Sequence, residues 1–127
     1  MVAFEIGTPL IRLMMEIGYL ATGNGFSAEA DLIFEGLRAV RPASEIPIIG
    51  LAVNRMNAGR PLEAASLLEE QALRLCPGSE LALGFLGLAL RLAGHRGRSQ
   101  SVLKDLAAKA TNPCAGAMAR ALLADHA

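Results

Sequence analysis

Apolar residues recur along the chain at steps of three and four positions, the period that places side chains on one face of an α-helix. The clearest run extends from Ala30 to Val40. Such stretches alternate with short breaks at Gly25, Gly59 and Gly94, where a helix can end in a left-handed residue. The pattern predicts seven helices connected by short turns, and an all-α fold.

The helices form a repeat. The three glycines are 34 and then 35 residues apart, and other positions keep the same phase. Each first helix has a bulky residue followed by a small one: Ile17-Gly18, Leu51-Ala52 and Leu86-Gly87. Each second helix has a small residue, Ala30, Ala64 or Ser99, and then a large one, Phe34, Leu68 or Leu103. A proline ends each unit: Pro42, Pro77 and Pro113. A period of this length indicates a stack of helical hairpins.

Capping residues and prolines predict where the helices begin. Thr8-Pro9 starts the first helix, Ser27, Ser44 and Ser79 cap the second, third and fifth, and Pro61 opens the fourth. We expect residues 95–98 to form a connector, a sixth helix at about 99–110, and a seventh at about 114–125 after Asn112-Pro113.

Composition limits the kind of partner. Lys plus Arg and Asp plus Glu number 12 each, without a basic run, which disfavours nucleic acid as a partner. Hydrophobic residues make up 53% and the mean hydropathy is +0.39. A small stack of hairpins has difficulty burying so much apolar surface, so we expect part of it to contact another protein.

The first 21 residues are apolar but contain Glu5, Arg12 and Glu16, and no basic segment precedes them. They therefore match neither a signal peptide nor a membrane span, and we expect a cytoplasmic protein. Cys76 and Cys114 lack C-x-x-C spacing and clustered histidines, which favours two buried thiols over a disulfide or a metal site.

No group of residues has the pattern of a catalytic site. His95 lies in a Gly- and Arg-rich turn, His126 lies beside the last residue, and Ser99 and Ser101 have no partnered histidine and acid. We therefore predict a protein that is not an enzyme and has no cofactor and no metal.

When its three repeats are aligned, the chain resembles the tetratricopeptide repeat (TPR) family, whose unit is a 34-residue helical hairpin. Gly18, Ala52 and Gly87 match the small residue of the first helix, and Ala30 and Ala64 match that of the second. The resemblance implies one domain, 1–127, that forms a right-handed superhelix. It would have repeats at about 8–42, 43–77 and 78–112, and a capping helix at about 113–125.

The resemblance also implies that the first helices line a concave groove. Ten residues would then face a partner: Arg12, Met15, Tyr19, Ile49, Val53, Met56, Asn57, Leu81, Leu88 and Arg91. Most are apolar, which suits the apolar face of a bound helix. The alternative is that these residues are core, covered by a neighbouring helix or by residues 2–6 folded into the groove.

Small TPR proteins with apolar grooves resemble the chaperones of bacterial type III secretion, above all the needle-subunit chaperone. That resemblance implies a partner helix from a needle or translocator subunit, and a second small helical chaperone. A homodimer would cover the same surface in the absence of substrate. The alternative function is an adaptor or self-associating scaffold unrelated to secretion. A clamp for an acidic C-terminus is disfavoured, because few cations and amides fall in the groove.

Overall fold

The computed structural model describes residues 7–124, so residues 2–6 and His126, which enter the expectations above, lie outside the described part. The described chain is helical throughout, without strands. Its elements are α1 (Thr8–Gly23), α2 (Ser27–Val40), α3 (Ile46–Asn57), α4 (Pro61–Leu67), the π-helical turn η1 (Leu68–Ala72), α5 (Leu73–Leu75), α6 (Glu80–Leu92), α7 (Arg96–Lys109) and α8 (Pro113–Ala124). Because α4, η1 and α5 follow one another without a break, they act as one rod, and the described chain has the seven predicted helical rods.

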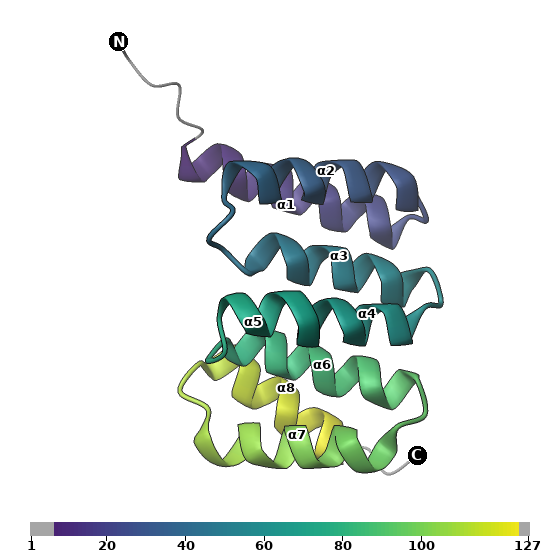
Figure 1. The fold of residues 1–127 in the computed structure, drawn as a ribbon, viewed down its shortest axis with the longest axis vertical. Helices are drawn as coiled ribbons and strands as arrows, with labels where there is room; N and C mark the ends of the chain where they lie inside the picture. Colours follow the sequence, from purple (N-terminus) through teal and green to yellow (C-terminus); the bar gives the residue numbers. More distant parts are fainter. Residues whose placement is uncertain (1–6, 125–127) are drawn as a thin grey trace.

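The rods stack as antiparallel hairpins in chain order (Figure 1). The helix α1 pairs with α2, α3 with the α4–α5 rod, and α6 with α7, while α8 packs on both α6 and α7. Each hairpin therefore contacts mainly the hairpin before it and the one after it, as expected for a helical solenoid. The predicted superhelix of three hairpins and a capping helix is confirmed.

Each hairpin turns at a glycine with positive φ: Gly25 at 82°, Gly59 at 77° and Gly94 at 87°. Residues with a Cβ rarely adopt this conformation, so the repeated glycine has a direct physical cause. Each second helix starts two residues after its glycine. The predicted connector at 95–98 is therefore wrong, since α7 already begins at Arg96.

The predicted helix caps are only partly correct. Ser79 caps α6, because its hydroxyl oxygen accepts a hydrogen bond from the Ala82 amide at 3.3 Å. Ser27 does not cap α2, because its hydroxyl donates to Asn54 Oδ1 at 3.3 Å instead. Thr8 is likewise the first residue of its helix rather than its cap.

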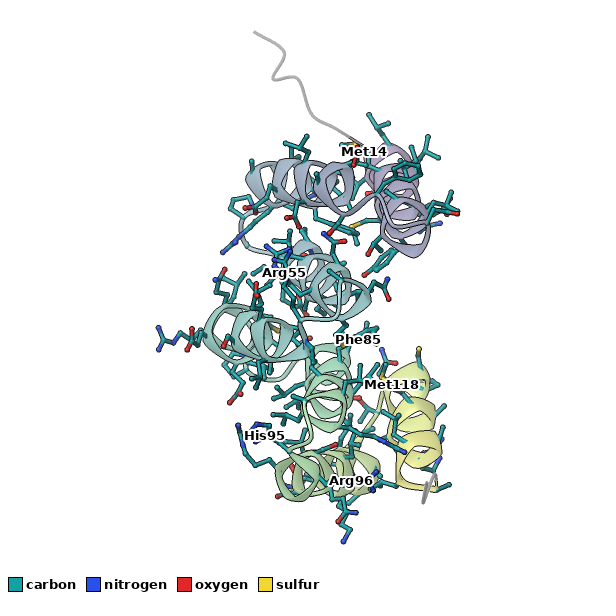
Figure 2. All side chains as sticks on the ribbon, turned by 90° about the vertical axis from the view of Figure 1, so that its right-hand side faces the viewer. Met14, Arg55, Phe85, His95, Arg96 and Met118 are labelled. Carbon is teal, nitrogen blue, oxygen red and sulfur yellow. The ribbon has the colours of Figure 1, made fainter. Side chains whose placement is uncertain are left out.

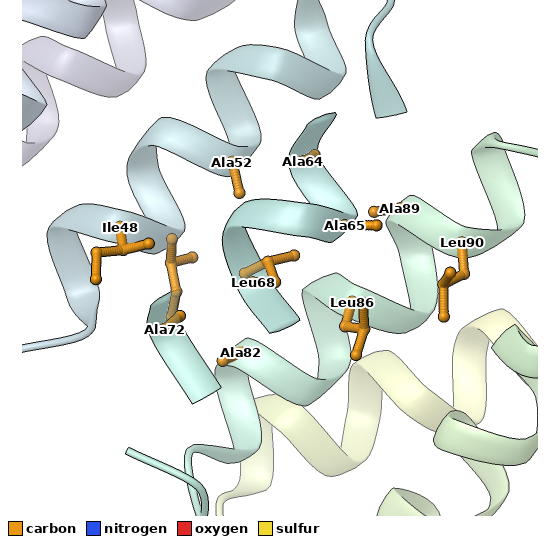
Figure 3. Packing of buried hydrophobic residues seen from close by; sticks show 11 residues of the cluster. Ile48, Ala52, Ala64, Ala65, Leu68, Ala72, Ala82, Leu86, Ala89 and Leu90 are labelled. Carbon is orange, nitrogen blue, oxygen red and sulfur yellow. The ribbon is translucent and has the colours of Figure 1, made fainter. Parts of the chain in front are cut away.

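The repeated small and large residues explain how the two helices of each hairpin pack together. The Phe34 ring packs on the backbone of Gly18, and the Leu103 side chain packs on that of Gly87. In the middle hairpin the corresponding residues, Ala52 and Leu68, share one buried cluster (Figure 3). A large residue of each second helix thus occupies the space left by a small residue of the first helix. This packing brings the two helices of each hairpin close together.

Three buried clusters follow one another along the stack. The first joins α1, α2 and α3, the second joins α3, the α4–α5 rod and α6, and the third joins α6, α7 and α8. Between α2 and α3 a polar group is also buried: Asn54, 1% exposed, donates to the Ser27 carbonyl at 2.9 Å and to Asp31 Oδ1 at 2.8 Å. Arg55 lies beside it and pairs with Asp31 at 2.8 Å.

Candidate protein-binding face

In Figure 2, α1 lies to the right of α2 and α3 to the right of the α4–α5 rod, whereas α7 lies below α6. On the right-hand side of this view α1 and α8 stand further out than α3 and α6. We call the surface of α1, α3 and α6 that is turned away from the second helices the inner face. Its residues occupy equivalent positions of the repeat, such as Tyr19, Val53 and Leu88.

Apolar side chains predominate on the inner face. Seven of them keep part of their surface accessible, and together we call them the inner strip: Met15, Tyr19, Val53, Met56, Phe85, Leu88 and Leu92. Leu92 is the most open of the seven, at 56% exposed. Leu88 and Leu92 belong to none of the three buried clusters, so their contacts within the fold leave them accessible to a partner.

Five of the ten predicted groove residues are apolar, half-buried and in contact with the core: Met15, Tyr19, Val53, Met56 and Leu81. Part of each side chain packs against the core, and only the rest of its surface can contact a partner. Ile49 is different, because it is 2% exposed and belongs to the central cluster. The prediction that Ile49 faces a partner is therefore wrong. Ile49 is buried among residues of α3, the α4–α5 rod and α6.

The predicted polar residues mainly connect helices. The Asn57 amide donates to Thr22 Oγ1 at 3.1 Å and so joins the end of α3 to the end of α1. Arg91 donates to the Leu122 carbonyl at 2.8 Å and joins α6 to α8. Arg12 is exposed and lines a shallow hollow on α1. These side chains do not converge on one point, which agrees with the sequence argument against a carboxylate clamp.

Phe85 and Leu92 are inner-strip residues that the sequence analysis did not name. Phe85 is half-buried, packs against the central cluster and lies where α6 borders α3 (Figure 2), at the repeat position of Glu16 and Gly50. It falls four residues after Leu81 and three before Leu88, and Leu92 follows four residues later. The spacing of this stripe was available in the sequence. The all-round apolar character of α6 concealed which of its faces stays open.

Tyr19 connects the inner face to the core. Its ring meets the Phe34 ring edge to face, with centroids 5.1 Å apart and planes at 65°. Burial raises the pKa of the Tyr19 phenol above its ordinary value, because the phenolate would lose hydration. As the single tyrosine in a chain without tryptophan, Tyr19 is a built-in spectroscopic reporter for this face.

Other chemistry is sparse. Among residues 7–124, no three His, Cys, Asp or Glu side chains gather as a metal site would require, and no helix in this range is long and apolar enough to cross a membrane. Both cysteines are free thiols. Cys114 is exposed and Cys76 is only partly buried, so the prediction of two buried thiols is wrong. A hollow of about 330 Å³ between α6, α7 and α8 has Arg91, Arg96 and Lys104 in its lining, away from the inner strip.

Solved structures identify the fold. The Yersinia enterocolitica type III secretion translocator chaperone SycD matches with a TM-score of 0.73 and 14% sequence identity, over 93% of this chain and 90% of that chain. The chain has a TPR-like fold. The Sgt2 TPR domain from Aspergillus fumigatus matches with a TM-score of 0.68 and 17% identity, over 90% of this TPR-like chain and 77% of that chain. No family model and no curated protein matches the sequence.

Proposed function

We propose that the chain is a cytoplasmic chaperone that holds an apolar or amphipathic helix of a type III secretion substrate, a needle or translocator subunit, on its inner strip until export. The observation that carries the proposal is the inner strip itself, a set of accessible apolar side chains on all three first helices. The likeness in fold to a secretion chaperone supports the choice of partner.

The chemistry of the inner strip suits a helix better than an extended peptide. Its side chains come from helices and leave few free backbone groups to pair with a strand, whereas apolar anchors three and four residues apart on a partner helix can settle between them. Met15 and Met56 are flexible and adapt to an irregular apolar surface. A second small helical chaperone would be an additional partner of the same complex.

Co-expression with needle-like or translocator-like proteins from neighbouring genes tests the proposal. We expect a soluble complex whose mass exceeds that of the chain alone. Val53→Asp and Leu92→Asp place a charge on the inner strip and should abolish capture, whereas Leu32→Asp, at a 76% exposed position on α2, should not. Circular dichroism checks that each variant is folded. Undiminished capture by folded Val53→Asp and Leu92→Asp chains would rule out the inner strip as the binding site.

The alternative function is an adaptor unrelated to secretion, which the match to the Sgt2 TPR domain also supports. A TPR-like fold is therefore not restricted to secretion chaperones. Tight self-association that Leu92→Asp disrupts, together with failure to capture any co-expressed substrate, would favour the adaptor, because the inner strip would then be occupied by the chain's own copies.

A further inference from the structure

A hollow of about 330 Å³ lies between α6, α7 and α8, and none of the seven inner-strip residues lines it. Three cationic side chains do line it: Arg91 from α6, and Arg96 and Lys104 from α7. At 3.6 residues per turn, Arg96 and Lys104 lie within about a quarter turn of each other around the helix. Arg96 lies on α7 next to α8 (Figure 2). Two helices thus bring three positive charges to one concave surface.

The charge at this end of the molecule contrasts with the neutral chain as a whole. Residues 81–124 contain six of the 12 Lys and Arg residues but a single acid, Asp105. That acid pairs with Lys109 at 2.9 Å, and no acid is among the described residues that line the hollow. Arg91 is held in position, because it donates to the Leu122 carbonyl at 2.8 Å. Converging positive charges on a concave surface attract an anion.

Another part of the wall is apolar. Leu103 of α7 is 2% exposed, and Leu122 and Leu123 of α8 are half-buried. All three line the hollow beside the cations. Sites for small molecules typically measure about 300–1,000 Å³ and combine apolar walls with a few polar groups. The hollow has this composition and falls at the lower end of this range of size, so it can hold an organic group as well as an anion.

We propose that the hollow binds a small organic phosphate monoester, with the phosphate at Arg91, Arg96 and Lys104 and the organic group against the three leucines. A phosphate monoester carries a charge of about −1.5 to −2 at neutral pH, which matches three converging cations better than a single carboxylate does. Guanidinium groups can also bind two phosphate oxygens through parallel hydrogen bonds.

This site goes beyond the proposed function. Its cations come from α6 and α7 and part of its apolar wall from α8, so a bound monoester would connect the capping helix to the third hairpin. A ligand that binds only the folded chain stabilises it, and thermal unfolding therefore reports on binding. Substrate capture on the inner strip is a separate property, and failure of one leaves the other standing.

Isothermal titration calorimetry of the full chain with phenyl phosphate, at constant ionic strength, tests the proposal. We expect saturable binding and a higher melting temperature in the presence of the probe. Benzoate keeps the ring but carries one negative charge, and inorganic phosphate lacks the ring, so each should bind several-fold more weakly. Absence of saturable binding of phenyl phosphate at millimolar concentrations, or equally tight binding of benzoate, would overturn the proposal.

Two substitutions on α7 locate the bound phosphate. Arg96→Gln and Lys104→Gln each remove one cation at an exposed position, and each should weaken phenyl phosphate binding by about tenfold, the typical loss for a charge-assisted hydrogen bond. Lys109→Gln is the matched control, because Lys109 lies on the same helix, pairs with Asp105 and does not line the hollow. Circular dichroism checks that all three variants are folded. Unchanged binding by both hollow variants, or an equal loss with Lys109→Gln, would contradict the assignment.

An acidic segment of a protein partner is the competing occupant. A hexaglutamate peptide in the same titration should bind more weakly than phenyl phosphate, because it has no ring to place against the leucines. If the peptide binds more tightly and Lys104→Gln weakens it, the hollow is a docking site for an acidic protein and the proposal of a small phosphate ligand is wrong.

Discussion

The ring of Phe34 in α2 lies directly against the backbone of Gly50 in α3, so that a Cβ at position 50 would overlap Phe34 Cε1. The same ring contacts Gly18 of α1, where a Cβ would lie 2.7 Å from Phe34 Cζ. One fully buried side chain therefore occupies the space between three helices and connects the first hairpin to the second.

We predict that Gly50→Ala destabilises the fold by about 1–3 kcal/mol, the typical result of overfilling a packed core. Gly36→Ala on α2 is the matched control, because nothing lies within 4 Å of its Cβ position. It should stabilise the chain by about 0.5–1 kcal/mol through helix propensity. Urea unfolding of both variants measures the difference. Equal effects at the two positions would mean that the Phe34 contact is not tight.

Asn54 supplies a second test of the α2–α3 contact. Asn54→Ala removes its hydrogen bonds to Ser27 and Asp31 and leaves the Ser27 hydroxyl without its acceptor, while Asp31 keeps its pair with Arg55; we expect a cost of about 1–3 kcal/mol. Asn57→Ala is the control, because Asn57 is exposed and donates only to Thr22 among described side chains. We expect a loss of about 0.5 kcal/mol there. Unfolding curves with equal midpoints for the two variants would contradict the role assigned to Asn54.

Glu80 makes stability depend on acid pH. Its carboxylate accepts hydrogen bonds from the backbone amides of Asn112, at 2.7 Å, and Thr111, at 3.0 Å, and these lower its pKa in the folded state. A lowered folded pKa stabilises the fold above the ordinary carboxylate pKa, and this contribution disappears as the pH falls through the folded value. Glu80→Gln should therefore be less stable than the wild type at neutral pH.

Thermal unfolding across the acid range measures the effect. The difference in melting temperature between wild type and Glu80→Gln should shrink as the pH falls, because protonation gives the wild type the same loss. Glu70→Gln, at an exposed position within η1, is the control for replacing a surface carboxylate that lacks these backbone contacts. A constant difference for Glu80→Gln would contradict the prediction.

Tyr19 reports on the inner face through its phenol. Because burial raises its pKa, a spectroscopic titration of the folded chain should show ionisation at higher pH than in the urea-unfolded chain. A bound helix would remove more water from the ring, so the complex should titrate higher still. An unchanged Tyr19 titration in a verified complex would place the bound partner elsewhere.

Much of the architecture could be predicted because its causes are local. A hairpin turn needs a residue that tolerates positive φ, so Gly25, Gly59 and Gly94 mark the turn within each hairpin in the sequence itself. A close helix pair needs one small and one large residue at matched positions, so the Gly18–Phe34 and Gly87–Leu103 contacts follow from the columns. The same phase places the start of α7 at Arg96, two residues after Gly94, although capping signals suggested a later start.

The sequence could not show which apolar residues form the inner strip, because that depends on how the helices pack against one another. Ile49 and Val53 are similar apolar residues on one helix, yet the first is buried in the central cluster and the second keeps part of its surface exposed. Leu51 and Ile17 occupy the same column, but only Leu51 has a preceding described hairpin to bury it. Local periodicity thus determined which residues are helical and where the chain turns. Only the packing of whole helices against one another decided which apolar faces remain exposed, because exposure is a property of the neighbours and not of the residue.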